Sequence, residues 1–142
     1  MIVVDANVLI KAYVPEVLSE KAGDLLRKLE RKSPLFVVPD LIFPEIGSIL
    51  WKKNRLNELT GEESKEILNE IITLPLKVEP SKSIARLAIE IALIYGITMY
   101  DAIYFSLAAT YDTKLLTADK RLVDRLEVGE LGRHIEWLGN LF

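Results

Sequence analysis

Short apolar runs rich in β-branched residues alternate with longer amphipathic segments along this chain, and this alternation constrains the fold more than any other feature. The apolar runs have the length and composition of buried strands and lie at 2–4, 36–38, 76–78, 114–117 and 135–137. The segments between them repeat apolar residues with helical spacing and cover 6–13, 18–32, 40–55, 60–72, 81–95, 98–111 and 118–126. This order predicts a three-layer α/β/α domain with a mostly parallel sheet of four to five strands, buried on both faces.

Several predicted helices carry recognisable residues at their ends. Asp40 and Ser81 each precede a periodic apolar segment, so we expect both to act as N-caps. Residues 60–63, with the sequence TGEE, have the form of a capping box, and Ser33-Pro34 should end the helix before it. With half of its 142 residues hydrophobic, the chain is expected to form a single domain over 1–142.

The chain contains no cysteine and a single histidine, His134. It therefore has no thiolate nucleophile, disulfide or cysteine-based metal site, although a Ser-His-Asp triad around His134 stays conceivable. Asp5 interrupts the apolar N-terminal run, and charged residues interrupt the apolar stretch 84–111, so we expect neither a signal peptide nor a membrane span. The expected protein is soluble and cytoplasmic, with no membrane partner.

Two acidic residues follow predicted strands, at the edge where open α/β sheets bind ligands. Asp5 comes directly after the first strand, and Asp119 comes just after the fourth, which ends at Thr117. Either acid could instead be an ordinary helix N-cap. Asn7 and Thr117 are placed to support these acids by hydrogen bonds, or to cap the following helices.

Two further acids lie on helix faces that are otherwise apolar. Glu45 shares its face with Leu41, Ile42, Ile46 and Ile49, and Asp101 shares its face with Tyr104, Phe105 and Ala108. A carboxylate on a core-facing stripe is costly unless it is protonated, paired with a cation or bound to a metal. A buried salt bridge to Lys or Arg is the structural alternative.

Taken together, the acids Asp5, Glu45, Asp101 and Asp119 favour one shared cation site. Like charges brought together repel, and a divalent cation removes the repulsion. Ligands that are all oxygen favour Mg²⁺ or Mn²⁺ over zinc. Such a cation lowers the pKa of a bound water, which can then attack phosphorus without a protein nucleophile. The expected chemistry is therefore hydrolysis of phosphodiester bonds by a metal-activated water.

The overall charge bears on whether the substrate is a nucleic acid. The formal net charge is −3, from 18 basic and 21 acidic residues, which by itself disfavours such a partner. If the four acids above bind metal, 17 acidic residues remain against the 18 basic ones. Lys114, Lys120 and Arg121 lie near Asp119 in the sequence and are candidates to contact RNA phosphates, with a solvated surface as the alternative.

At these acids the sequence resembles the PIN-domain family, in particular its VapC-type ribonuclease toxins. The matching segments are IVVDANVLI around Asp5, PDLIFPEIGSILWK around Glu45, TMYDAIYFSLA around Asp101 and LLTADKRL around Asp119. Together with the order of strands and helices, they cover nearly the whole chain. The resemblance implies an endoribonuclease that depends on Mg²⁺ or Mn²⁺, a homodimer, and a small antitoxin that blocks the site.

The resemblance also implies a role for each site residue. It assigns the acidic metal site to Asp5, Glu45 and Asp101, a more variable fourth acid to Asp119, and support of the ligands to Asn7 and Thr117.

Two alternatives to the nuclease remain open from the sequence. A HAD-like phosphatase would use Asp5 as its nucleophile, but that motif has a second acid where this chain has Asn7. A non-catalytic binding module with the same fold is the other. Apolar helix faces around 18–29 and 84–95 indicate a dimer or antitoxin interface, and we expect Trp51 and Trp137 in the core or at a dimer contact.

Overall fold

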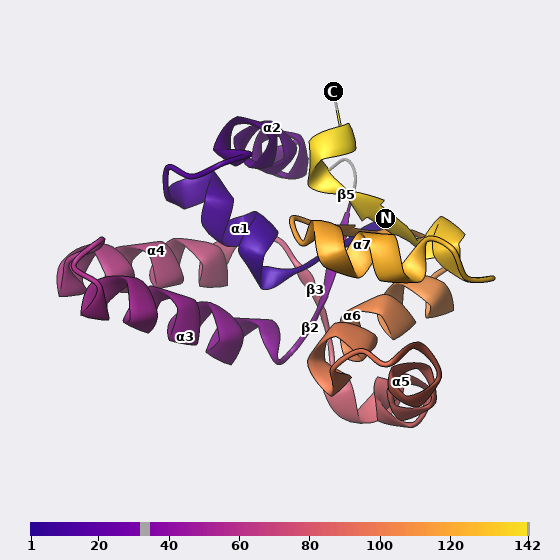
Figure 1. Cartoon of the computed structure of the whole chain (residues 1–142). Helices are drawn as coiled ribbons and strands as arrows, with labels where there is room; N and C mark the ends of the chain where they lie inside the picture. Colours follow the sequence, from indigo (N-terminus) through magenta and orange to yellow (C-terminus); the bar gives the residue numbers. More distant parts are fainter. Residues whose placement is uncertain (32–34, 142) are drawn as a thin grey trace.

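A computed structural model of the chain describes residues 1–31 and 35–141. Its centre is a five-stranded sheet in the order β3-β2-β1-β4-β5, in which all neighbouring strands are parallel. The strands are β1 (Ile2–Val4), β2 (Phe36–Pro39), β3 (Lys77–Glu79), β4 (Leu115–Thr117) and β5 (Ile135–Trp137). Helices cover both faces of the sheet (Figure 1), so the predicted three-layer α/β/α architecture is confirmed.

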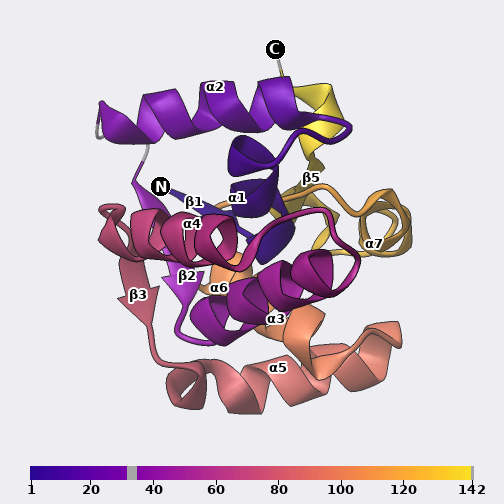
Figure 2. The ribbon, with the colours of Figure 1, turned by 90° about the vertical axis from the view of Figure 1, so that its left-hand side faces the viewer.

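The helices follow the predicted order closely. They are α1 (Ala6–Tyr13), α2 (Ser19–Glu30), α3 (Ile42–Arg55), α4 (Gly61–Thr73), α5 (Ser81–Tyr95), α6 (Met99–Thr110) and α7 (Lys120–Leu126), with 3₁₀ turns at Gly132–His134 and Leu138–Asn140. The pairs α1 and α2, α3 and α4, and α5 and α6 pack directly on each other. In Figure 2, α2 crosses the top of the molecule and α5 the bottom, with α3 and α4 between them.

The central strands are buried as the sequence predicts, whereas the edge strand β3 is not. The residues of β2 and β4 are buried throughout, and β1 is buried at Val3 and Val4. In β3, Lys77 and Val78 are exposed, so the prediction that the strands are buried on both faces is wrong there. Among the described strands β3 pairs only with β2, which leaves its other edge without a neighbouring strand.

Helix α6 forms the middle of the core. Every residue from 102 to 108 is buried, which is typical of a helix enclosed between other elements. It contacts β1, β2 and β4 on one side and α5 on the other, where the rings of Phe105 and Tyr95 meet edge to face with centroids 6.3 Å apart. This packing fixes the first turn of α6, which carries Asp101, against the sheet.

The N-caps of α3 and α5 differ from the prediction. Helix α3 begins after Leu41 with no side-chain cap, and Asp40 instead accepts a hydrogen bond of 3.1 Å from the backbone N–H of Ser81. Asp40 therefore caps α5, whose own N-cap residue is Pro80 rather than Ser81. The reason is that β2 and β3 are neighbours, which places the starts of α3 and α5 side by side. The pairing continues to Asp40, whose N–H donates to the carbonyl of Glu79 at 2.8 Å.

Other helix ends agree with their sequence signals. The capping box is confirmed, because Thr60 and Glu63 exchange hydrogen bonds of 2.9 and 3.1 Å between side chain and backbone. Gly96 ends α5 with φ +65°, a left-handed conformation that favours glycine. The helix stop predicted at Ser33-Pro34 lies outside the described residues.

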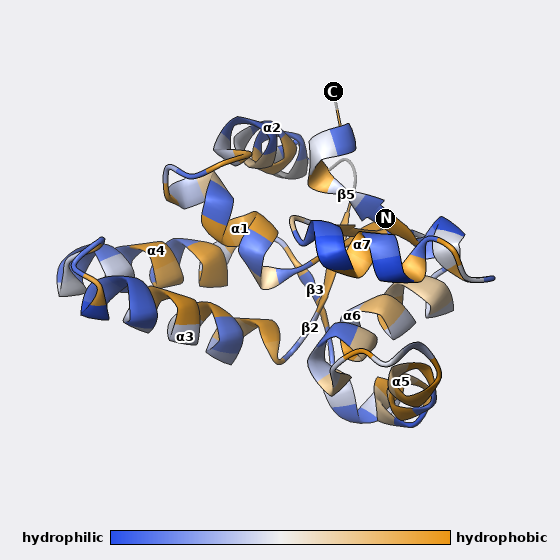
Figure 3. Cartoon of the chain, in the orientation of Figure 1, coloured by the Kyte–Doolittle hydropathy of each residue, from blue (hydrophilic) through white to orange (hydrophobic). Residues whose placement is uncertain are grey.

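Apolar surface remains on α5 and at one tryptophan. On α5, whose apolar residues are visible in Figure 3, Leu93 and Ile94 are 77% and 75% exposed. Trp51 is 65% exposed, so it does not lie in the core, and the predicted dimer contact is the possibility that remains for it. Trp137 is half-buried under the ammonium group of Lys120, 5.4 Å from its ring centroid. Among the described residues no single helix has the length and hydropathy of a membrane span; only α5 and α6 together reach them, bent by 113°.

Candidate active site

Four separated acids lie at the carboxyl edge of the sheet. Asp5 directly follows β1 and Asp119 comes two residues after β4, while Glu45 and Asp101 lie in the first turns of α3 and α6. The acids are close enough to raise one another's pKa: Asp5 is affected by Asp101 and Asp119, and Glu45 by Asp5 and Asp101. The fold thus gathers these acids from four elements into one negatively charged cluster.

Asp5 is held by hydrogen bonds on both carboxylate oxygens. Its Oδ1 accepts from the backbone N–H of Val8 at 3.0 Å, which caps α1, and its Oδ2 accepts from the hydroxyl of Thr117. Burial raises the pKa of Asp5 to about 6, with a further contribution from the charges of Asp101 and Asp119, although the two hydrogen bonds act in the opposite direction. Asp5 is therefore an oriented carboxylate that loses its proton only near neutral pH.

Thr117 connects two of the acids. It ends β4, which is the neighbour of β1, and this pairing brings its side chain beside Asp5. While its hydroxyl donates to Asp5, its oxygen accepts a hydrogen bond of 3.0 Å from the backbone N–H of Asp119. The supporting position predicted for Thr117 is thus occupied by a buried side chain that fixes the relative placement of Asp5 and Asp119.

Glu45 has the least compensated carboxylate of the cluster. Its pKa is raised to about 7, mainly by burial and in part by the charges of Asp5 and Asp101, although the nearby hydroxyl of Tyr104 acts in the opposite direction. Even so, neither Glu45 Oε1 nor Tyr104 Oη has a well-aligned hydrogen-bond partner among the described residues, although both atoms are buried. A buried carboxylate oxygen without a partner is a costly arrangement that binding of a cation would relieve.

Asp101 and Asp119 differ in exposure. Asp101 is half-buried, and burial raises its pKa, with a smaller contribution from the charge of Asp119. Asp119 is exposed, and its Oδ1 accepts hydrogen bonds from the backbone N–H groups of Arg121 and Leu122 at 3.0 and 3.2 Å. Asp119 therefore acts as the N-cap of α7, and only its Oδ2 is free of these bonds.

The acids of the cluster have no ion-pair partner in the part of the chain that the structure describes. Within the described residues, none of Asp5, Glu45, Asp101 and Asp119 forms an ion pair with Lys, Arg or His. The salt-bridge alternative considered for Glu45 and Asp101 is therefore wrong. This absence sets the cluster apart from the other part-buried acids of the molecule.

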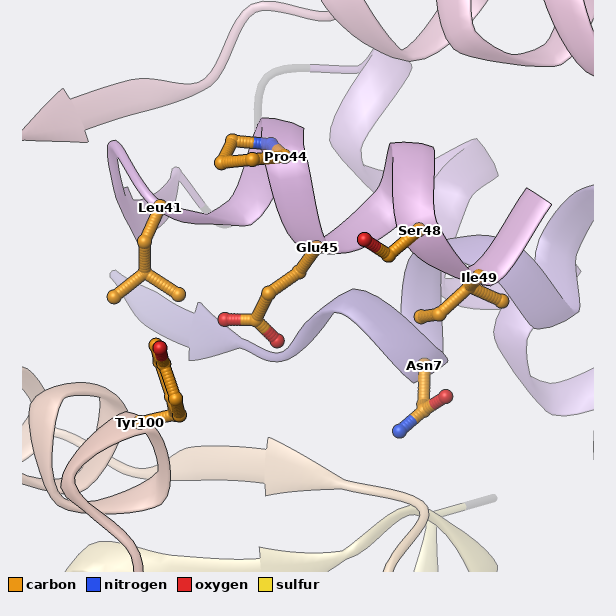
Figure 4. A pocket seen from close by; sticks show the side chains of 7 residues that line it. All are labelled: Asn7, Leu41, Pro44, Glu45, Ser48, Ile49 and Tyr100. Carbon is orange, nitrogen blue, oxygen red and sulfur yellow. The ribbon is translucent and has the colours of Figure 1, made fainter. Parts of the chain in front are cut away.

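Two clefts adjoin the cluster on either side of the start of α6. The first, of about 560 Å³, is lined by Asn7, Leu41, Pro44, Glu45, Ser48, Ile49 and Tyr100 (Figure 4). The second, of about 320 Å³, is lined by Gly96, Ile97, Thr98, Asp101, Asp119, Arg121, Leu122 and Arg125. Asn7 makes no hydrogen bond to an acid in the described structure and instead borders the first cleft.

Only one of the three predicted phosphate contacts borders the acids. Arg121 lines the second cleft and has no ion pair within the described residues. Lys120 pairs with Asp124 at 2.8 Å, and Lys114 pairs with Glu136 at 2.8 Å. Lys114 precedes β4 whereas Asp119 follows it, and a three-residue strand spans about 10 Å, so Lys114 lies at the opposite end of β4 from Asp119, and its contact with an RNA phosphate stays a prediction.

Sequence reasoning groups Arg125 with the basic residues near Asp119, and Arg125 lines the second cleft while donating a hydrogen bond of 2.5 Å to the carbonyl of Gly96. It missed Tyr100 and Ser48, which line the first cleft. Their sequence neighbours give no signal of this, because a cleft is formed by elements far apart in the chain. His134 is buried, with its Nδ1 2.8 Å from the carbonyl oxygen of Thr113 and its Nε2 4.0 Å from a carboxylate oxygen of Asp112, and no hydrogen bond of the described residues joins it to a serine.

The donor set fits a hard divalent cation. All the acids offer oxygen, no counter-charge competes, and Glu45 keeps a buried oxygen without a partner. As the side chains stand, however, no three acidic or histidine groups of the described residues are close enough to hold one ion between them. Mg²⁺ takes one or two protein carboxylates and completes its shell with water and phosphate oxygens, so a pair of these acids would suffice.

Comparison with known proteins assigns the family. A family model of the PIN domain matches residues 2–127. Ribonuclease VapC3 of Pyrobaculum aerophilum is 34% identical over 126 residues, which cover 87% of this chain and 93% of the relative. Ribonuclease VapC1 of Mycobacterium tuberculosis is 30% identical over 122 residues, which cover 83% and 89%.

Solved structures share the fold at lower identity. The crystal structure of PAE2754 from Pyrobaculum aerophilum aligns with a TM-score of 0.66 at 23% identity, covering 97% of this chain and 90% of the other. VapBC2 from Rickettsia felis, solved bound to a DNA fragment from its promoter, aligns with a TM-score of 0.65 at 13% identity, covering 96% and 98%. The family match sets aside the HAD-like alternative for Asp5. With a family model matched over most of its length and a relative of more than 30% identity, the chain belongs to the PIN-domain family.

Proposed function

We propose that this chain is a ribonuclease that depends on Mg²⁺ or Mn²⁺ and acts as the toxin of a toxin–antitoxin pair. The observation that carries the proposal is the cluster of four acids with no counter-charge, in which Asp5 and Glu45 have pKa values raised to about 6 and about 7. Two relatives at 30% identity or more are named ribonucleases, which supports the choice of substrate. The whole of 1–142 would serve as one nuclease domain.

The residues of the cluster would divide the work of the site. Asp5, Glu45 and Asp101 would hold the cation, and Asp119 would contribute through its free Oδ2 or through water. When bound, the cation would supply the positive charge that lowers the pKa of a water and offsets charge on the phosphate. RNA phosphodiester hydrolysis then needs no nucleophile from the protein.

The chain itself would orient the ligands and the RNA. The hydrogen bonds from Val8 N–H and the Thr117 hydroxyl hold the Asp5 carboxylate in one orientation. Burial of Tyr104 behind Glu45 keeps water from that side of the carboxylate. Arg121 and Arg125 border the second cleft and would bind phosphates on either side of the scissile one, which positions the strand without reading its sequence.

A cleavage assay tests this proposal. End-labelled single-stranded and structured RNAs are incubated with the purified chain in Mg²⁺, Mn²⁺ or EDTA. We expect cleavage with either cation, none in EDTA and none by Asp5→Asn, which keeps the shape of the side chain but removes its charge. The matched control is Asp124→Asn, an exposed acid of α7 that pairs with Lys120 and should leave cleavage unchanged.

Two outcomes would contradict the nuclease. One is RNA that survives every cation condition, and the other is an Asp5→Asn variant that cuts as fast as the parent. In either case a non-catalytic binding module with this fold becomes the better explanation. Its affinity for RNA is then the property to measure.

The partners follow from the same proposal. We expect a homodimer, because the exposed apolar residues Leu93 and Ile94 on α5 favour contact with another chain. Sedimentation as a monomer at micromolar concentration would contradict it. We also expect a small antitoxin encoded beside the toxin gene to copurify with the chain and suppress cleavage, and we expect both to act in the cytoplasm.

A further inference from the structure

The first cleft has the form of a site for a flat, largely apolar group. Its volume of about 560 Å³ is in the range of small-ligand sites. Leu41, Pro44 and Ile49 give it apolar walls, and Tyr100 faces Leu41 and Glu45 across it (Figure 4). An aromatic ring opposite aliphatic side chains is an arrangement that accepts a planar ring between them.

Tyr100 is exposed although the middle of α6, from 102 to 108, is buried. The side chain of Tyr100 is 64% exposed, whereas Tyr104, one turn later, is 2% exposed. The ring of Tyr100 therefore contributes little to the core, and it lies open at the cleft. Aromatic side chains placed in this way provide the stacking surfaces on which proteins bind the bases of single-stranded nucleic acids.

Polar groups at the cleft match the edge of a nucleobase. The amide of Asn7 offers a donor and an acceptor, and the hydroxyl of Ser48 offers both. Both side chains border the cleft, and neither has a hydrogen-bond partner in the part of the chain that the structure describes. Apolar walls with a few unpaired polar groups at the rim suit a base, which has apolar faces and a polar edge.

The position of the cleft connects such a base to the acids. Tyr100 lines the first cleft and the next residue, Asp101, lines the second, so a base held on Tyr100 has its phosphate beside the acidic cluster. Arg121 and Arg125 at the second cleft supply positive charge for the adjoining phosphate. We propose that the first cleft holds one unpaired nucleobase of the RNA, stacked on Tyr100, with Asn7 and Ser48 at its polar edge.

This inference rests on the proposed function, since it requires RNA as the ligand, and it narrows the substrate to unpaired RNA. In a duplex the faces of a base are covered by its neighbours, so duplex RNA cannot place one on Tyr100. Tyr100 is a binding and positioning residue here, and its effect should appear in affinity more than in the rate at saturating RNA.

Fluorescence anisotropy with a labelled single-stranded oligoribonucleotide tests the inference without requiring cleavage. Binding is measured with the full chain in the non-cleaving Asp5→Asn background, in Mg²⁺. Tyr100→Ala should weaken binding about 5- to 150-fold, because loss of one base stack costs about 1–3 kcal/mol. Tyr100→Phe keeps the ring and should bind within about twofold of the parent. Ile72→Ala, a comparably exposed apolar position on α4, is the matched control and should leave RNA affinity unchanged.

Three results would overturn the inference. The first is equal RNA affinity of Tyr100→Ala and the parent. The second is an equal loss of affinity, on the Tyr100→Ala change, for the same strand annealed to its complement. The third is a change in the sedimentation of Tyr100→Ala without a change in its RNA affinity. The last would make the cleft a protein contact. Cleavage by the parent together with RNA affinity that does not depend on Tyr100 would overturn this inference alone, whereas Tyr100-dependent binding without any cleavage would overturn the nuclease alone.

Discussion

Two part-buried carboxylates, one at each end of helix α3, have neighbours of opposite charge. Glu45 in its first turn has no cation partner among the described residues, and burial raises its pKa to about 7. Glu16, in the loop between α1 and α2, packs against Lys53 in the last turn of α3 and against Lys11, which lies 2.9 Å away. Burial alone would raise the pKa of Glu16 as well, but the hydrogen bonds and charges of Lys53 and Lys11 outweigh it and hold that pKa below its usual range.

Glu16 therefore stabilises the fold, whereas Glu45 destabilises it until a cation binds. Glu16 joins α1 and α3 through charges that the protein itself supplies. Glu45 shares its surroundings with Asp5 and Asp101, whose charges oppose its own. Burial is common to both, so the charge of the neighbours, and not the degree of burial, marks Glu45 as a candidate ligand for a cation.

The largest expected contrast between the two acids is in catalysis. Glu45→Gln should lower the initial rate of RNA cleavage in Mg²⁺ by about 100-fold or more, because it removes a charged ligand of the cation. Glu16→Gln should stay within about twofold of the parent, since it touches neither cleft. Equal losses in the two variants would show that the contrast between them has no functional meaning.

The stability gained on cation binding should depend on Glu45 and not on Glu16. At a free Mg²⁺ or Mn²⁺ concentration of about 100 times its Kd, the free energy of unfolding should rise by about 2.7 kcal/mol. Calorimetry should show this rise in the parent and in Glu16→Gln, but a smaller one in Glu45→Gln. An undiminished rise in Glu45→Gln would place the cation away from Glu45.

The two regions should give opposite slopes of stability against pH in EDTA. The pKa values of Asp5 and Glu45 rise from 3.8 and 4.5 to about 6 and about 7 on folding, so the folded state binds more protons between these limits. Stability should therefore fall by about 1–2 kcal/mol as pH rises from about 4 to 7, after allowance for solvent screening. The lowered pKa of Glu16 has the opposite sign, and its contribution should be lost as pH falls below the unfolded value of 4.5.

Denaturant unfolding at closely spaced pH values measures both slopes. Glu45→Gln should flatten the slope between pH 4 and 7 and leave the acid limb unchanged, while Glu16→Gln should flatten only the acid limb. A parent protein whose stability does not change between these pH values would contradict the raised pKa values of the cluster.

The smallest contrast is in stability at a fixed pH of about 8 in EDTA. Glu45→Gln should raise the free energy of unfolding by about 1 kcal/mol, because it removes a charge held among other carboxylates. Glu16→Gln should lower it by about 1 kcal/mol, because it leaves two lysines without their shared partner. Glu62→Gln is the control, an exposed acid of α4 whose change should stay within about 0.5 kcal/mol. Shifts of the same sign at positions 45 and 16 would remove the distinction.

Much of the fold could be predicted because its signals are local. The apolar runs of β1, β2, β4 and β5 and the periodic segments of the helices depend on residues a few positions apart, and their bounds agree with the structure to within about two residues. The predictions failed where a neighbour distant in sequence decides the outcome. Asp40 caps α5 instead of α3 because β3 lies beside β2, and β3 itself is exposed because it forms the edge.

The sequence by itself determined the order of the elements, the mostly parallel character of the sheet and the carboxyl-edge positions of Asp5, Thr117 and Asp119, because each follows from periodicity along the chain. Only the tertiary structure decided which acids have an ion-pair partner and that Tyr100 opens onto a cleft. It also decided that Lys114 lies at the opposite end of β4 from Asp119, where it pairs with Glu136. Charge compensation and clefts arise between elements that the chain brings together from far apart. Local patterns do not record those contacts.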